Sequence, residues 1–296
     1  MSAEATAIKP QQQPQQQQRS SRSIRFWRLD TAATVSLLFL VLVTALSVAA
    51  PLIAPYSPTE QDIVNSLAQP SAEHWLGTDD LGRDVLSRLI HGAAASLFSS
   101  FLAVAVAIVL GVPIGLLAGF LGGWTDDVIS RGIDTLLSFP AIVLAIAVTG
   151  ALGIGLINGM IAVGIVFSPQ LARLVRARTL VVRQELYVDA ARCFGASTGR
   201  ILWRHVLPNT VQPVIVQVTL LLAGALLAEA SLSFLGLGIQ PPHASWGAML
   251  ARAYQNMELA PEQMYPPGLA ILFTALAFNT LGESLRVALD PTMKHR

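Results

Sequence analysis

The chain has 296 residues, of which 53% are hydrophobic and only 12% are charged. Soluble domains carry about 25% charged residues, so this composition excludes an ordinary soluble protein. The formal net charge of +1 gives no indication of nucleic-acid binding. Cys193 is the only cysteine, which excludes an internal disulfide and any CxxC metal or redox motif.

Uncharged runs predict membrane spans. Residues 31–59, 92–125 and 135–172 carry no charge, and a spanning helix needs about 20 apolar residues. We divide the last run at its glycine-rich stretch, 150–159, and predict an all-α polytopic membrane protein with six transmembrane helices. The predicted spans are 32–53, 93–121, 133–152, 156–175, 210–234 and 268–289.

The segments outside these spans differ in character. We predict a disordered, basic N-terminal tail over 1–31, an external segment over 54–92 and a C-terminal tail over 290–296. Most arginines fall in the tails and in the loop 176–209, whereas the opposite side holds only Arg83, Arg88 and Arg252. The positive-inside rule therefore places both termini and this loop in the cytoplasm.

The basic loop contains the stretch "YVDAARCFGASTGRILWRHVLPNT", residues 187–210. Residues 178–194 contain no Pro or Gly and predict a helix, which Gly195 can end in the left-handed conformation. Ser197 can cap a second helix over 198–207, which Pro208 closes before the fifth span. One interpretation is a solvated loop whose arginines only fix topology. A second interpretation is that the backbone of another chain approaches this loop closely. It is favoured by four small residues, Ala190, Ala191, Gly195 and Ala196.

This stretch resembles the cytoplasmic loop of bacterial ABC-importer permeases. That pattern reads Glu-Ala-Ala, three residues, Gly, nine residues, an apolar residue, any residue, then Leu-Pro. Asp189 stands where Glu is commoner, and His205 stands where an apolar residue is usual. The matching residues are Ala190, Ala191, Gly195, Leu207 and Pro208. The resemblance implies that the loop forms a coupling helix, which docks into a groove of a cytoplasmic ATPase subunit.

Three further stretches narrow the resemblance. Residues 74–97, 228–250 and 278–291 look like segments of peptide-type permeases, although Ala94 stands where an arginine is common. The chain thus resembles the C-type permease of the dipeptide/oligopeptide/nickel importer group, which implies a type I ABC-importer permease fold with a permease core over 93–289. The implied cargo is short peptides, with nickel chelates, glutathione or another small solute as alternatives.

The same resemblance implies partners and a location. A sister B-type permease would form a heterodimer with this chain, two ABC ATPase subunits or domains would bind from the cytoplasm, and an external binding protein would deliver the cargo. The expected location is the cytoplasmic membrane of a prokaryote.

The positions of the lysines indicate independently whether this chain could hydrolyse ATP itself. A phosphate-binding loop needs a lysine in a Gly-Lys-Ser/Thr context, and the two lysines, Lys9 and Lys294, do not follow a glycine. We therefore expect a non-catalytic subunit without a cofactor of its own, with ATP and Mg²⁺ bound by the partner ATPases. An intramembrane hydrolase is disfavoured because no histidine falls in the middle of a span. A self-contained channel or ion-coupled transporter is disfavoured by the few intramembrane charges and by the lack of an obvious inverted repeat.

Two other groups of charged residues are candidate sites. Glu229, near the external end of the fifth span, could face the translocation path or hold the bend that follows it, and we favour the structural role. The external mixed-charge cluster is either a solvated, ion-paired face of a surface helix or a docking surface; it comprises Asp79, Asp80, Arg83, Asp84 and Arg88. The histidines lack metal-site spacing, so we predict no metal.

Overall fold

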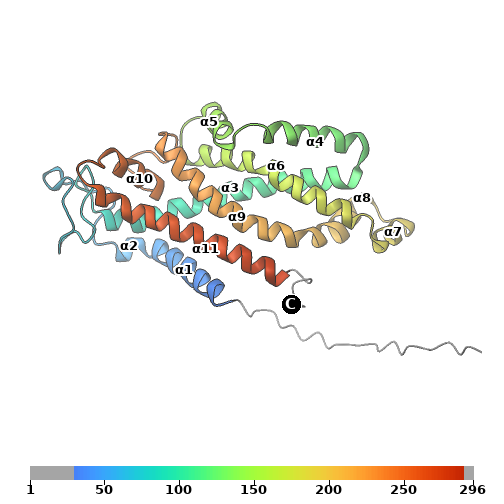
Figure 1. Cartoon of the computed structure of the whole chain (residues 1–296), viewed down its shortest axis with the longest axis horizontal. Helices are drawn as coiled ribbons and strands as arrows, with labels where there is room; N and C mark the ends of the chain where they lie inside the picture. Colours follow the sequence, from blue (N-terminus) through green and yellow to red (C-terminus); the bar gives the residue numbers. More distant parts are fainter. Residues whose placement is uncertain (1–29, 290–296) are drawn as a thin grey trace, which may run out of the picture.

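A computed structural model describes residues 30–289, so residues 1–29 of the predicted N-terminal tail (1–31) and the whole predicted C-terminal tail (290–296) lie outside the described residues. Within the described range the chain folds into helices and forms no named strand. The helices make an elongated bundle (Figure 1). Their bounds are α1 Thr31–Val48, α2 Ala50–Ile53, α3 Val85–Leu121, α4 Gly123–Leu137, α5 Ala141–Leu152, α6 Leu156–Val182, α7 Leu186–Cys193, α8 Thr198–Ile201, α9 Leu207–Phe234, α10 Trp246–Gln255 and α11 Tyr265–Leu289.

Length and apolar composition allow five of these helices to cross a membrane, or up to six if a bent pair counts as one span. The all-helical membrane fold predicted from the sequence is confirmed. The bent pair corrects the third predicted span, 133–152, because α4 and α5 meet there at 97°. The break falls at Ser138–Pro140, where proline lacks an N–H and disfavours helical geometry for Phe139. Residues 123–132, which lie between the second and third predicted spans, belong to α4.

Other helix ends also differ from the predicted spans. Helix α3 begins at Val85, inside the predicted external segment, because the Asp84 carboxylate accepts a hydrogen bond from the Ser87 backbone N–H at 2.7 Å and caps the helix. Helix α6 continues to Val182, beyond the predicted end at residue 175.

Small residues bring α3 and α6 into backbone contact. Every fourth residue of α3 from Ala103 to Gly119 is Ala or Gly. A Cβ built on Gly111 would lie 2.7 Å from the Ser168 carbonyl oxygen, and one on Gly115 would lie 2.5 Å from that of Ala172. This spacing is typical of close helix pairs in membranes, and it makes α3 and α6 a tightly joined pair.

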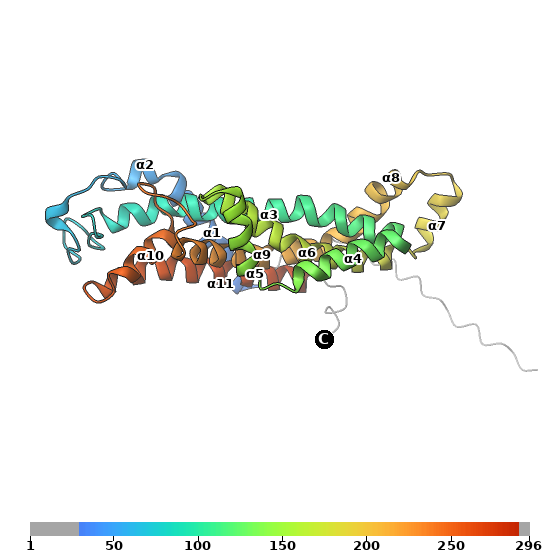
Figure 2. The same cartoon turned by 90° about the horizontal axis from the view of Figure 1, so that it is seen from above.

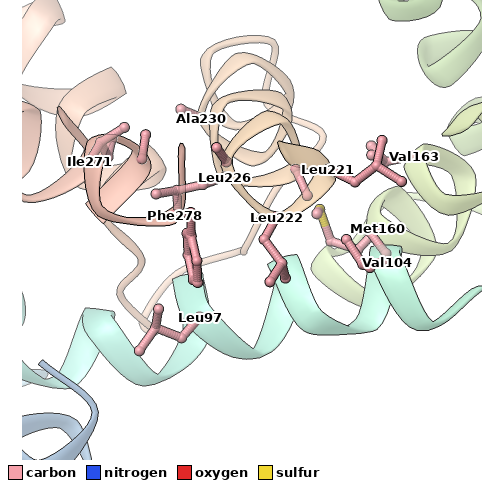
Figure 3. Close-up of a cluster of buried hydrophobic side chains, with 14 of the residues drawn as sticks. Leu97, Val104, Met160, Val163, Leu221, Leu222, Leu226, Ala230, Ile271 and Phe278 are labelled. Atoms are coloured by element: carbon pink, nitrogen blue, oxygen red, sulfur yellow. The ribbon is translucent and has the colours of Figure 1, made fainter. Parts of the chain in front are cut away.

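The main hydrophobic core lies between α3, α6, α9 and α11. Figure 3 shows Leu222 of α9 and Phe278 of α11 directed toward α3, where Leu97 and Val104 lie. A second, smaller cluster packs around the segment that joins α6 to α9. It comprises Leu116, Val175, Val182, Val188, Ile201 and Val206.

Candidate functional sites

The two groups of candidate residues lie at opposite ends of the bundle. The segment with α7 and α8 extends from one end, and α10 lies toward the other (Figures 1 and 2).

Helix α7 has one anchored face and one open face. Val188 is fully buried in the second hydrophobic cluster, where Ala191 and Ala196 also pack. By contrast, Leu186 and Phe194 are 85% and 91% exposed. Large apolar side chains on such a projecting helix are typical of a docking surface.

Gly195 ends α7 as predicted, in the left-handed region with φ +74°. The Gly195 N–H donates to the Arg192 carbonyl at 2.9 Å, and the Ala196 N–H donates to the Ala191 carbonyl at 3.0 Å. These two bonds form a Schellman motif, which satisfies carbonyls that the helix end would otherwise leave free. The turn therefore fixes the direction in which the chain leaves α7.

The predicted helix–break–helix is wrong in two details. The helix predicted over 178–194 is interrupted at 183–185, which lets α7 turn away from α6. The second predicted helix, 198–207, does not end at Pro208 but runs through a π turn, Leu202–Val206, into α9. Proline is tolerated there because it lies in the first turn of α9, where its missing N–H is not needed. Ser197 takes the N-cap position of α8, but its side chain accepts no capping hydrogen bond.

The motif residues divide between two surfaces. Asp189, Ala190 and Gly195 are exposed on α7 and its turn, and Pro208 is exposed farther along the chain. The half-buried ones pack on the second hydrophobic cluster, namely Ala191, Ala196 and Leu207. The sequence analysis missed three exposed apolar residues, Leu186, Phe194 and Trp203. Large apolar side chains in a charged loop could have indicated them.

A contact between rings joins α7 to the π turn. The ring centroids of Tyr187 and His205 lie 6.4 Å apart. Desolvation and, less strongly, the Glu185 carboxylate raise the pKa of the Tyr187 hydroxyl above its ordinary value. The hydroxyl is therefore protonated at neutral pH and adds no charge to this surface.

The external mixed-charge cluster is not a solvated face, because Arg83 and Arg88 are only 1% and 3% exposed. The Arg83 Nε donates to Asp79 Oδ2 at 2.7 Å, and the Arg88 Nε lies 3.3 Å from the same oxygen. Arg88 Nη1 also donates to the Pro58 carbonyl at 2.7 Å. These contacts tie the external segment to the first turn of α3.

Asp84 and Arg88 are four residues apart, as an ion pair on a surface helix would be, but they do not pair with each other. Asp84 caps α3 instead, and its other oxygen lies 3.0 Å from His74 Nδ1. Asp80 reaches Arg252 of α10 at 2.7 Å, with both side chains about 30% exposed. The cluster therefore fastens α10 to the external segment, and docking of a partner here remains a prediction.

Glu229 is a residue of α9 and is only 1% exposed. Its Oε1 accepts hydrogen bonds from Ser233 at 2.9 Å and from Ser245 at 2.7 Å. Ser245 in turn caps α10 by accepting from the Ala248 N–H at 3.1 Å. The next residue, Trp246, donates its backbone N–H to the Ser96 hydroxyl of α3 at 3.0 Å. These contacts favour the structural interpretation of Glu229.

Within residues 30–289, no group of three or more His, Cys, Asp or Glu side chains is placed to hold a metal ion.

Two family models match the chain. The model described as "Binding-protein-dependent transport system inner membrane component" matches residues 111–295. The model described as "N-terminal TM domain of oligopeptide transport permease C" matches residues 21–70. Together they cover the first span and the part of the bundle from residue 111 onward, in agreement with the resemblance seen in the sequence.

Curated relatives match over nearly their whole length. A dipeptide transport system permease protein of Alkalihalophilus pseudofirmus is 44% identical over 88% of this chain and 86% of its own. A glutathione transport system permease protein of Pectobacterium atrosepticum is 44% identical over 91% of both chains. The Escherichia coli O157:H7 glutathione permease is 46% identical over 91% of this chain and 89% of its own.

A solved structure shares the fold. A chain of the MetNI methionine ABC transporter, in an inward-facing form, superimposes with a TM-score of 0.55 at 18% identity. The superposition covers 69% of this chain and 97% of that chain. It identifies the bundle as the type I importer fold.

Proposed function

Because the chain belongs to the family of binding-protein-dependent transport inner membrane components, as a permease subunit of the dipeptide and oligopeptide ABC importers, we propose that its cargo is short peptides. Relatives that are permeases for dipeptide and for glutathione are similarly close in identity. Glutathione, a nickel chelate or another small solute remains the alternative cargo.

The observation that carries the coupling role is the geometry of α7. The helix projects from one end of the bundle (Figure 2), its inner face is anchored through Val188, and its outer face presents Leu186 and Phe194. We assign this outer face as the surface that docks on a cytoplasmic ATPase chain. ATP and Mg²⁺ are bound by the ATPases, and this chain performs no covalent chemistry.

Alternating access then follows from rigid-body motion. Two ATPase chains close on ATP and displace α7, which is joined through the second hydrophobic cluster to α3 and α6. A sister permease faces this chain across the path, and an external binding protein delivers the cargo. Rocking of one half against the other opens the path to each side of the membrane in turn. Both termini and the α7 segment lie in the cytoplasm, as the arginine distribution indicates.

The docking role is tested by a matched pair of glycine substitutions. A Cβ built on Gly195 or on Gly199 meets nothing within 4 Å, but only Gly195 has a positive φ. Gly195→Val therefore strains the turn after α7, by about 1–2 kcal/mol for the left-handed conformation, whereas Gly199→Val adds the same side chain without that strain.

The readouts are retention of ATPase chains during affinity purification and uptake of radiolabelled dipeptide in proteoliposomes. We expect Gly195→Val to lose ATPase chains or uptake, and Gly199→Val to keep both. Normal retention together with normal uptake in Gly195→Val would refute the docking role. Competition of dipeptide uptake by unlabelled glutathione, and the reverse experiment, decides the cargo.

A further inference from the structure

The last turn of α3 contacts both ends of the segment 183–192, which follows α6 and includes most of α7. This segment is not adjacent to α3 along the chain. Arg183, the residue after α6, donates from Nη1 to the Gly119 carbonyl at 2.9 Å. Arg192 of α7 places its guanidinium carbon 5.3 Å from the centroid of the Phe120 ring. Two neighbouring residues of α3 therefore receive two arginines, one from each end of the segment 183–192.

Each contact has a physical reason to be stable. The Gly119 carbonyl lies in the last turn of α3, where carbonyls lack N–H partners within the helix and a cation is favoured by the helix dipole. Arg192 is oriented by Asp189, whose Oδ1 accepts its Nη1–H at 3.1 Å. Its planar cation can thus rest on the face of Phe120, as cation–π pairs do.

These contacts give the two arginines partners that membrane orientation alone does not require. Arg183 is half-buried, and Arg192, although exposed, is held between a carboxylate and a ring. Arg178 is exposed on α6 and serves as a comparison. If arginines here only fixed orientation in the membrane, neither a helix-end carbonyl nor an aromatic face would be needed as a partner.

We infer that Arg183 and Arg192 are positioning residues that lock α3, α6 and α7 into one unit, so that movement of α7 reaches α3 directly. The inference rests on the proposed coupling function. Chain connectivity alone would deliver that movement only to α6 and α9, and the second hydrophobic cluster reaches α3 only through apolar contacts, which are not directional. Helix α3 has 37 residues, or about 55 Å, and its opposite end holds Arg88 in the buried external cluster. The two arginines therefore join the cytoplasmic surface to the external end through a single helix.

The native cysteine allows a test that needs no substrate. Cys193 is the only cysteine and is exposed on α7, and Leu121, at the end of α3, is 52% exposed. In the assembled complex, spin labels on Cys193 and on Leu121→Cys report the distance between α7 and α3. We expect one distance distribution, unchanged between the nucleotide-free and ATP-bound states. In Arg192→Gln we expect the distribution to shift or broaden when ATP binds.

Transport gives the second readout, as dipeptide uptake per ATP hydrolysed in proteoliposomes. From the strength of an exposed cation–π contact we expect Arg192→Gln and Phe120→Leu each to lower this ratio about two- to fivefold. The double variant should not lower this ratio further than the more strongly affected single variant, because the two substitutions remove the same contact. Arg192→Lys and Phe120→Tyr keep a cation and a ring and should restore the ratio, and Arg178→Gln should not change it.

The outcomes separate the inference from the proposed function. An ATP-dependent distance change in the wild-type complex, or multiplicative losses in the double variant, would overturn the locked unit even with normal uptake. A wild-type complex that retains ATPase chains but takes up neither dipeptide nor glutathione would overturn the proposed cargo, and the spin-label distances would still decide the inference. If Phe120→Leu does not fold, the Arg192→Gln and Arg192→Lys pair carries the same comparison.

Discussion

The close contact of α3 with α6 makes Gly115 the position where one added methyl group should be most informative. A Cβ at Gly115 would lie 2.5 Å from the Ala172 carbonyl oxygen and 2.7 Å from the Val175 Cβ. Non-bonded heavy atoms pack at about 3.5–4.0 Å. Neither neighbour is the end of a flexible side chain, so the two helices themselves must move apart.

The magnitude follows from a comparison with a second glycine. Overpacking of this kind costs about 1–3 kcal/mol, but any Gly→Ala change inside a helix also gains about 0.5–1 kcal/mol from the lower entropy of the unfolded chain. Gly132 lies within α4, and a Cβ there meets nothing within 4 Å. Gly132→Ala thus carries the gain without the clash. The difference between the two variants isolates the overpacking cost, which we expect to be about 1–3 kcal/mol.

The assay is unfolding of the purified chain in mixed micelles by SDS titration, followed by far-UV circular dichroism. Gly115→Ala should unfold at lower SDS than wild type or near it, and Gly132→Ala at slightly higher SDS. Equal unfolding free energies for the two variants would refute the backbone contact between α3 and α6. In that case the glycines of α3 would need another explanation.

Two further predictions concern the external end of the bundle. Glu229→Ala should lower the unfolding free energy more than Glu229→Gln, because Gln keeps an oxygen for Ser245 whereas Ala leaves buried hydroxyls unpaired, at about 1–3 kcal/mol; equal losses in the same SDS assay would contradict this. Arg83→Gln should cost about 3–5 kcal/mol because it leaves the mostly buried Asp79 carboxylate without its main partner. Arg252→Gln breaks a pair whose side chains are about 30% exposed, and it should cost less than about 1 kcal/mol. A larger loss for the Arg252 variant would show that the buried pair is not the stronger attachment.

Much of the fold follows from the sequence because membrane helices depend on local properties. A long uncharged run specifies a helix wherever its backbone must be satisfied without water, and the predicted spans that became α1, α3, α6, α9 and α11 were recognised in this way. Uncharged runs did not predict helix breaks that are caused by the shape of proline, because such breaks leave no change in hydrophobic composition. Pro140 lies inside an apolar run and bends α4 against α5, whereas Pro208, in a polar loop, lies in a helix that continues.

The candidate sites were predicted less evenly. Gly195 could be assigned to a helix end because its conformational freedom is a property of one residue. The burial of the charged side chains in the external mixed-charge cluster could not be predicted, because burial depends on contacts between residues that are distant in the sequence. Arg88 bonds the Pro58 carbonyl across 30 positions, and Asp80 reaches Arg252 across 172. A charged cluster read along the chain therefore resembles a solvated face even when the fold encloses it.

The two ends of the bundle are built for different tasks, and this difference explains how one signal could cross the molecule. At the end of the bundle near α10, Glu229 attaches α10 to α9, the Ser96 hydroxyl attaches it to α3, and the Asp80–Arg252 pair attaches it to the segment that precedes α3. At the other end, α7 is attached by apolar contacts through Val188 and by Arg192 to Phe120 of α3, and Arg183 fastens the turn before α7 to Gly119. Apolar contacts alone tolerate small sliding movements because they are not directional, and the two arginine contacts with α3 remove that freedom. A displacement that begins at α7 would therefore move α3 as a body, and the rigid external attachments would convert that movement into a shift of α10.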